Sequence, residues 1–384
     1  MHSFKKAVVL FSLPFSLASF HSYAHSDARG IAMAGTGVAA ANFVSASFYN
    51  PALAASGESK HSFGMILPAV TAGVHDGDGM LDKLDVYFDA EDDWVDNPTS
   101  SEAQEAWKAA LRDLSNGDVT ANASAGMVFA VPNSFINTNF FVATHATALA
   151  TMDIDDNDFD NISPDDEVRS TVTGLIGGTL DIGFTFAKNY EVYDRNLSVG
   201  FSPKVQQIYT TYFQERLNED ELDDADFFDD LEEKTTFNLD IGASYEVIDH
   251  LNVAFVAKNI LSHSLETNVQ MGQTATYVVE PEYKLGSAYS KDWYTLTADI
   301  DLNSTRYFEE QSYKTQFTRI GGEVDLWKWA QFRAGYMHSM TEYAENMVTA
   351  GFGFRPYGVF GFDLAAQYGD DDNYVVSAQL TMII

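Results

Sequence analysis

Strand-like segments follow one another from residue 60 to the end of the chain, and they limit the fold more than any other feature. In several of these segments apolar and polar side chains alternate, which is typical of a β-strand with one apolar face. Residues 195–214 show the pattern clearly: Leu197, Val199, Phe201, Val205, Tyr209 and Phe213 on one face, Ser198, Ser202, Lys204, Gln206 and Thr210 on the other. We predict strands at residues 60–74, 119–131, 136–151, 170–187, 195–214, 235–247, 251–263, 277–289, 293–302, 313–326, 330–339, 346–355, 358–368 and 374–384.

The connections between these strands alternate between short and long. The short ones are residues 132–135, 189–194, 248–250, 290–292, 327–329 and 356–357. Bacterial single-chain membrane barrels have an even number of strands, with short turns at one end and long loops at the other. A soluble β-sandwich has no physical reason to keep this order. We therefore predict an all-β fold, a transmembrane antiparallel β-barrel of about 14 strands, and the 28 Phe and 19 Tyr fit its aromatic girdles.

The first 24 residues read as a secretory signal. Lys5 and Lys6 precede an apolar stretch at 7–20, and residues 22–24 resemble a cleavage site. No later run of about 18 apolar residues exists, so a membrane location requires a closed barrel. The chain has no cysteine, which excludes a lipoprotein anchor, disulfides and cysteine metal sites.

The net charge of −34 argues against nucleic acid as a direct partner, because the phosphate backbone repels an acidic surface. More than half of the acidic residues lie in four predicted loop windows, at residues 75–118, 153–167, 215–234 and 369–373. Such runs are usually solvated surface. The alternative is that they bind divalent cations beside a lipopolysaccharide layer, although residues 153–158 match only part of a calcium loop. One helix is predicted in the first window, at residues 101–114, with Ser101 and Gln104 as a capping box.

Residues 30–52 differ from the rest of the chain because they are mostly glycine and small residues. The segment is too rich in glycine for a stable helix and lacks the alternation of a strand. Small side chains let backbone pack closely on backbone, which suits a compact segment inside a larger structure. A glycine-rich loop before a soluble domain is the other interpretation. The motif residues are Gly35, Gly37, Asn50, Pro51 and Ala52.

An Asn-Pro-Ala motif at residues 50–52, followed by a strand-rich chain, resembles the FadL-type outer-membrane transporter superfamily, and within it the TraF-like conjugal transfer proteins. The resemblance implies an N-terminal hatch inside the barrel lumen. The domains are then a signal peptide at 1–24, a hatch at 25–57, and a barrel with acidic extracellular loops at 58–384. The chain ends in Met-Ile-Ile, where such barrels usually end in Phe.

The resemblance also implies two functions. The first is a monomeric barrel in the outer membrane of a Gram-negative bacterium, in contact with lipid and lipopolysaccharide, that binds a hydrophobic or amphipathic molecule such as a fatty acid. A shift of the hatch would release that molecule. The alternative is an outer-membrane component of a conjugative transfer or secretion complex, without transport activity. This chain has no cysteine, unlike the thioredoxin-like plasmid protein that shares the TraF name.

No catalytic motif occurs in the sequence, and we predict that the protein is not an enzyme and holds no cofactor or metal. A barrel lipase or protease is the alternative, since its groups would meet only in the fold. The strand pattern places His145 in the lumen, where a lone histidine is most often a wall residue.

Ligand-binding candidates follow from the strand faces. If the apolar faces meet lipid, the lumen contains charges of both signs, which pair with each other and with the hatch. Among them Lys204, Lys258 and Arg333 are the candidates to bind a carboxylate head group. Phe43 and Phe48 are the main apolar candidates in the hatch, together with Ile31, Met33 and Val38. Pro203, 177–178 and 321–322 are candidate positions for a lateral gap or a bulge in the wall.

Overall fold

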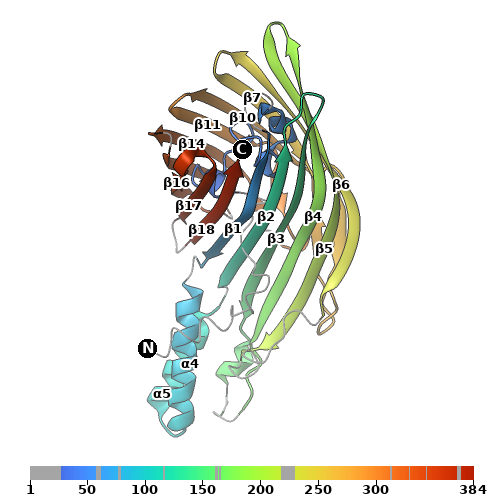
Figure 1. Ribbon diagram of the computed structural model, residues 1–384. Helices are drawn as coiled ribbons and strands as arrows, with labels where there is room; N and C mark the ends of the chain where they lie inside the picture. The colour runs from blue at the N-terminus through green and yellow to red at the C-terminus, as the bar shows by residue number, and fades with distance from the viewer. Residues whose placement is uncertain are drawn as a thin grey trace.

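The structure is a computed structural model, in which fourteen strands form one closed antiparallel barrel (Figure 1). It describes residues 27–57, 62–76, 79–115, 117–160, 163, 166–217, 230–311, 314–327, 329–342, 344–369 and 373–384. The predicted signal segment and most of the acidic window at 215–234 lie outside these residues.

Each barrel strand pairs with strands that are its neighbours in the chain, and the first strand closes the barrel against the last. The strands are β1 (Gly64–His75), β2 (Asp118–Val131), β3 (Asn137–Asp153), β4 (Thr171–Val192), β5 (Arg195–Arg216), β6 (Glu232–Ile248), β7 (Leu251–Lys258), β10 (Glu282–Lys291), β11 (Tyr294–Asp301), β14 (Phe317–Leu326), β15 (Ala330–Ser339), β16 (Met347–Phe354), β17 (Phe360–Gly369) and β18 (Asn373–Ile383). Short turns join them at one end of the barrel, here called the short-turn end, and long loops at the other, the long-loop end.

The predicted strand order and fold class are confirmed, and the differences lie in two long connections. The chain between β7 and β10 forms a separate hairpin of β8 (His263–Glu266) and β9 (Thr276–Val279). A second small sheet, β12 (Thr305–Arg306) with β13 (Lys314–Thr315), precedes β14. Both small sheets are separated from the next wall strand by only one or two residues, so the sequence does not show where the wall strand begins.

The polarity of the barrel is the reverse of that of a soluble protein. Leu296 and Val376 on the outer face are 58% and 56% exposed, whereas Thr185 and Asn238 on the inner face are fully buried. Outer apolar residues include Ile182, Phe184, Phe201, Phe237, Leu285, Ile320, Phe332, Leu364 and Leu380. An apolar outer wall around a polar lumen is the arrangement of a membrane-spanning barrel.

The N-terminal segment lies inside the barrel as a hatch, here defined as residues 27–57. It comprises α2 (Ala28–Ile31), α3 (Ala46–Tyr49) and the 3-10 helix η1 (Pro51–Gly57), and most of its residues are buried. Asp27 caps α2 by accepting a hydrogen bond from the Gly30 amide at 2.8 Å. The dark blue hatch and the cyan helices of the first long loop lie toward opposite ends of the barrel in Figure 1.

Two helices form the first long loop, α4 (Met80–Asp96) and α5 (Ser101–Asp113). The prediction at 101–114 is confirmed, although the capping residue is Ser100, whose hydroxyl accepts from the Ala103 amide at 3.2 Å. Helix α4 was not predicted. Its apolar residues pack against Trp107 and the long-loop ends of the neighbouring strands, including Val119 and Val172. Among the described residues, no helix has both the length and the apolar character needed to cross a bilayer.

Candidate functional site: the hatch and the lumen

The hatch lies directly on the barrel wall where the wall carries glycine. A Cβ atom on Gly335 would fall 2.7 Å from the carbonyl carbon of Met33, and one on Gly200 would fall 2.5 Å from that of Pro51. Such close approach of backbone to backbone requires glycine. The wall glycines whose added Cβ would meet the hatch are Gly64, Gly126, Gly200, Gly242, Gly286, Gly321, Gly335 and Gly351. Gly64, Gly126, Gly200 and Gly242 lie toward the short-turn ends of their strands, and the other four lie near the middle of shorter strands. Together they form a seat for the hatch.

Asn50, the first residue of the Asn-Pro-Ala motif, is fully buried between the hatch and two strands. Its side-chain amide donates to the Val38 carbonyl at 2.9 Å and lies 3.4 Å from the carbonyls of Ala243 and Phe255. Its carbonyl oxygen accepts from the Ala52 amide at 3.0 Å. One side chain therefore ties two parts of the hatch to β6 and β7.

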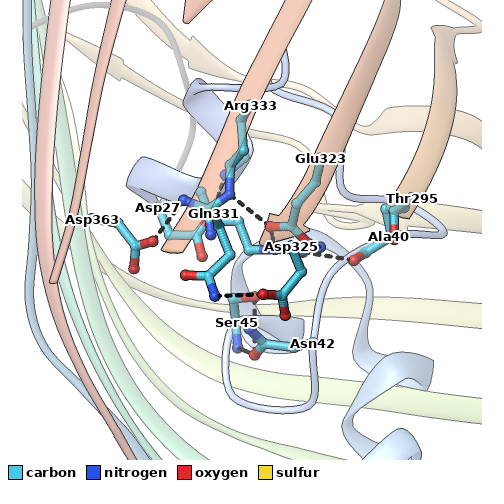
Figure 2. Close-up of polar contacts among 12 residues, drawn as sticks. Asp27, Ala40, Asn42, Ser45, Thr295, Glu323, Asp325, Gln331, Arg333 and Asp363 are labelled. Carbon is cyan, nitrogen blue, oxygen red and sulfur yellow. Dashed lines mark hydrogen bonds and ion pairs between the residues drawn. The ribbon is translucent and has the colours of Figure 1, made fainter. Parts of the chain in front are cut away.

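An ionic network joins the opposite side of the hatch to the wall. Arg29 donates to Glu323 on β14 and to the hatch carbonyl of Ala40. Arg333 on β15 lies between Glu323 and Asp363, at 2.6 Å from each (Figure 2). Buried charges are stable only when they are paired in this way. Arg333 is therefore in the lumen, as predicted, with its guanidinium bonded to two carboxylates.

The two motif glycines of the hatch act through their backbone conformation and backbone hydrogen bonds. Gly35 has φ of 78°, which favours glycine. The amides of Gly37 and Val38 both donate to one oxygen of Asp299 on β11, at 2.8 and 3.0 Å. A wall carboxylate thus binds the hatch turn that contains the second motif glycine.

The start of the hatch holds a buried carboxyl group. Asp27 accepts hydrogen bonds from the Gly30 amide and from the Tyr49 hydroxyl, at 2.8 and 3.0 Å. Burial raises the pKa of Asp27 above its ordinary value, against the opposing effects of the Gly30 hydrogen bond and of Arg29. Burial likewise raises the pKa of Tyr49. The docked hatch therefore favours the neutral form of Asp27.

Phe43 and Phe48 lie in an apolar sector of the lumen. They pack with Val44 against inward-facing residues of β1, β2 and β3, namely Ile66, Ala69, Val128, Ala130, Phe141 and Ala143. Elsewhere the inner wall is mostly polar. In this same sector β1 has a bulge between Ile66 and Ala69 that shifts its register with both neighbouring strands. The apolar part of the hatch therefore lies behind an irregular part of the wall.

Of the three positions predicted from the sequence for a lateral gap or a bulge, only Pro203 interrupts the pairing of two strands. Pairing between β4 and β5 stops after Lys204 and resumes at Phe201 without a change of register. The residues inside this gap are polar, since Thr185 bonds both Ser202 and Ser47. Pairing is continuous through 177–178 and 321–322.

The three predicted lumenal cations differ in their partners. Lys204 is buried between Asp181 and Asp240, at 2.9 and 3.1 Å, so two carboxylates already share its charge. Lys258 donates to the Phe48 carbonyl of the hatch at 2.8 Å. Among the described residues, no carboxylate lies within 4.0 Å of its ammonium. An ammonium has three donors, so Lys258 retains capacity for an acceptor.

A cavity of about 50 Å³ lies against the hatch, on its long-loop side. The hatch contributes Phe48 and Tyr49, and the wall contributes Lys258 and other charged groups from β10, β11 and β14. Two of these, Lys284 and Arg319, pair with Glu282 and Asp301. The structure therefore brings Phe48 and Lys258 together at one cavity, whereas Lys204, Arg333 and Phe43 do not line it.

Two residues of this site were not predicted from the sequence: Arg29, which bonds the hatch to the wall, and Lys284, which lines the cavity. Asp299, which bonds the hatch, and Arg319, which lines the cavity, were among the charges expected in the lumen. A signal for Arg29 existed, because it is the one charged residue between 28 and 57. Among the described residues, no group of three His, Asp or Glu side chains is arranged to hold a metal ion.

Solved structures share this fold at low sequence identity. A FadL homologue of Pseudomonas aeruginosa has a TM-score of 0.55 and 12% identity, covering 95% of this chain and 99% of its own. The toluene transporter TodX of P. putida has a TM-score of 0.51 and 13% identity, covering 94% and 98%. A TodX variant described as a monoaromatic hydrocarbon channel has a TM-score of 0.53. These likenesses confirm the predicted fold of a closed barrel with an N-terminal segment.

Comparison with curated proteins finds no match. A family model does match, over residues 47–301, which is well over half of the chain and includes the Asn-Pro-Ala motif. Its description is "F plasmid transfer operon, TraF, protein". The protein therefore belongs to this TraF family.

Proposed function

We propose that this protein is an outer-membrane channel for a hydrophobic or amphipathic small molecule, and that the docked hatch is its closed state. The observation that carries the proposal is the apolar sector, where Phe43 and Phe48 cover the lumenal side of the β1 bulge. An open pore for ions needs no such segment. The FadL homologue and the toluene transporter support the proposal, since they have the same fold.

The same observation favours one exit route. Hydrogen bonds between strands close a barrel wall, and the bulge in β1 disturbs the pairing on both of its sides. The gap at Pro203 is lined inside by polar hydroxyls, which an apolar molecule would leave unpaired. We therefore place the lateral exit at the β1 bulge, where movement of Phe43 and Phe48 would connect the lumen with the bilayer.

Lys258 is the residue we assign to the head group of an amphipathic substrate. It lines the cavity beside the hatch, and no carboxylate of the described residues lies within 4.0 Å of its ammonium. The carboxylates of Asp240 and Glu282 attract it from a longer distance. A carboxylate at Lys258 would form a charge-assisted hydrogen bond, which is stronger than the present bond to the neutral Phe48 carbonyl. Because the ammonium has other donors, the carboxylate need not displace the Phe48 carbonyl, but it would draw the ammonium toward itself and weaken a contact that holds the hatch. The cavity of about 50 Å³ accepts a head group rather than a whole amphipathic molecule, so entry of the tail requires the hatch to move.

In this proposal the short-turn end faces the periplasm and the long loops face outward. The barrel is a monomer, and the acidic helices α4 and α5 lie near the lipopolysaccharide. The roles predicted for Lys204 and Arg333 remain predictions, and their carboxylate partners favour Lys258 for the head group.

The test uses a fluorescent long-chain carboxylate and its methyl ester as probes. We expect Lys258→Met to weaken binding of the carboxylate by about tenfold and to leave the ester unchanged, because only the carboxylate forms an ion pair. Lys258→Arg keeps the charge and controls for loss of packing. If Lys258→Met leaves the affinity for the carboxylate unchanged, or weakens the affinity for both probes equally, the assignment is refuted. Absence of binding of either probe to the intact protein would refute the channel proposal itself.

The family match favours a second candidate, a component of a conjugative transfer or secretion complex. This candidate requires contacts at the short-turn end and no passage of small molecules. Exposed residues there include Phe135, Tyr193, Trp327 and Tyr357. Conjugation frequency and probe uptake, measured in the same deletion strain, separate the two: loss of transfer with normal uptake supports the complex, and the reverse supports the channel.

A further inference from the structure

Two long connections fold into the lumen above the hatch and form a lid, here defined as residues 263–279 and 305–311. Tyr277 of β9 is only 1% exposed, and its ring occupies the space beside Gly177, where an added Cβ would fall 2.1 Å from a ring carbon. Its hydroxyl lies 3.3 Å from Nε2 of His145 on β3. The lid therefore reaches across the inner face of the wall as far as β3.

Side chains of the lid also bond the backbone of β5. Asn268 accepts from the Tyr212 amide at 2.8 Å and donates to the Tyr212 carbonyl at 3.0 Å. Gln270 accepts from the Gln214 amide at 3.0 Å. Because these groups satisfy backbone atoms of β5 beyond Thr210, where its pairing with β6 ends, the lid has a defined position against the barrel.

Two cavities meet under the lid. The outer one is about 20 Å³ and includes the ion pair between Arg306 and Glu280, at 2.9 Å. The inner one is the cavity beside the hatch. Three residues line both: Glu282, Thr305 and Tyr307. Glu282 is on a barrel strand and bonds Lys284, and Thr305 is small, so Tyr307 is the large side chain between the two cavities.

The position of Tyr307 depends on aromatic contacts. Its ring is stacked with that of Tyr277, with centroids 6.3 Å apart, and lies edge-on to His145 at 6.4 Å. Its carbonyl accepts from the Val278 amide at 2.8 Å. The residue follows the two-residue strand β12 rather than a wall strand, so its ring can move without breaking the barrel ladder.

We propose that Tyr307 is the constriction between the long-loop end and the cavity beside the hatch, and that its ring sets the size of the molecules that reach Lys258. The role of Tyr307 in substrate passage rests on the proposed function. The constriction itself can be tested without any substrate. Size selection would then take place at the lid, before the molecule meets the hatch.

Thiol labelling tests the constriction, since the chain has no cysteine of its own. Thr315→Cys places one thiol in the inner cavity, which Thr315 lines. Glu309→Cys, an exposed position in the lid, is the access control. Thiol reagents of increasing size are added to whole cells, and the rate of labelling is measured for each.

We expect Tyr307→Ala to raise the labelling rate of Thr315→Cys with the larger reagents by about tenfold, because truncation opens the passage and weakens the aromatic contacts. Tyr307→Trp enlarges the ring, so it should lower the rate and reduce the largest reagent that reacts. The rate at Glu309→Cys should not change in either variant, which shows that the reagents reach the lid equally well. General unfolding of the lid would raise the rate at Thr315→Cys in both variants, whereas the constriction predicts opposite changes. If neither substitution changes the labelling rate at Thr315→Cys, the inference is overturned. Altered labelling with unaltered uptake of the fluorescent carboxylate would retain the constriction and refute the proposed function.

Discussion

Arg29 of the hatch and Glu323 of β14 form a two-point ion pair: Nε lies 2.9 Å from Oε2, and Nη2 lies 3.0 Å from Oε1. Arg333 donates to the same carboxylate at 2.6 Å. One wall carboxylate is thus shared by a guanidinium of the hatch and one of the wall. Since Glu323 keeps Arg333 when the hatch moves, the hatch can leave without exposing an unpaired buried carboxylate, whose cost would otherwise oppose opening.

A double-mutant cycle measures this pair. We expect Arg29→Met and Glu323→Gln each to lower the free energy of hatch opening, and the pair to show a coupling of about 1–3 kcal/mol because the residues touch. Opening is followed by exchange of the Ile31 and Ala32 amides, which are hydrogen-bonded within the hatch. Additive effects in the double variant would show that the contact does not hold the hatch.

Asn50→Ala should loosen the hatch by about 1–3 kcal/mol, because it leaves the Val38 carbonyl and the Ala52 amide without their partner. Trypsin cleavage after Arg29 reports the open state in detergent. The matched control is Asn42→Ala, since Asn42 accepts from Val44 and Ser45 within the hatch. Equal cleavage of the two variants would contradict the anchoring role of Asn50.

Gly335→Val should displace the hatch, since its Cβ would overlap backbone atoms of Met33 and Ala34. Overpacking of this kind costs about 1–3 kcal/mol. Ala334→Val is the control, because its exposed side chain is on the outer face. Both variants should run as folded, heat-modifiable barrels on gels, and only Gly335→Val should expose Arg29 to trypsin. Protection of Arg29 in Gly335→Val would mean that the wall glycines do not seat the hatch.

The buried carboxyl group of Asp27 should make the stability of the docked hatch depend on pH. Its pKa in the docked hatch is raised by burial above the ordinary value of 3.8. The resulting stabilisation is therefore fully present below that value and is lost as the pH rises through the raised pKa. We expect the free energy of hatch opening, from amide exchange corrected for the intrinsic rate, to fall from pH 4 to pH 8 relative to Asp27→Asn. If the free energy of hatch opening depends on pH in the same way in the intact protein and in Asp27→Asn, Asp27 does not cause the pH dependence.

The strands and the hatch could be predicted because each has a local signature. Clear alternation with period two in several segments, together with the regular order of short and long connections, identified the barrel strands, and small residues around the Asn-Pro-Ala motif identified the hatch. Helix α4 was missed because its many acidic residues suggested a solvated loop, although Leu84, Tyr87 and Phe88 have helical spacing. The lid was missed because β9, which is mostly apolar, is separated from β10 by only two residues, so the two together resemble one strand.

The partners of the lumenal charges could not be predicted from the sequence. Strand parity shows that Lys204, Lys258 and Arg333 face inward, but only strand register and the path of the hatch decide which carboxylates they meet. Lys204 meets Asp181 and Asp240 from its two neighbouring strands. Lys258 instead meets the end of α3, and this contact depends on a hatch whose position no periodicity encodes.

If a molecule passes only when the hatch moves, a reversible cross-link between the hatch and the wall should stop its passage. Ser47 of the hatch and Thr185 of β4 have hydroxyl oxygens 2.9 Å apart, so cysteines at both positions need only a small shift to form a disulfide of about 2.05 Å. Entry of the fluorescent carboxylate into proteoliposomes is measured before and after oxidation, with Ser47→Cys alone as the control. We expect oxidation to lower the rate of entry to that of protein-free liposomes, and we expect a reductant to restore the original rate. An unchanged rate with the hatch cross-linked to the wall would contradict this expectation.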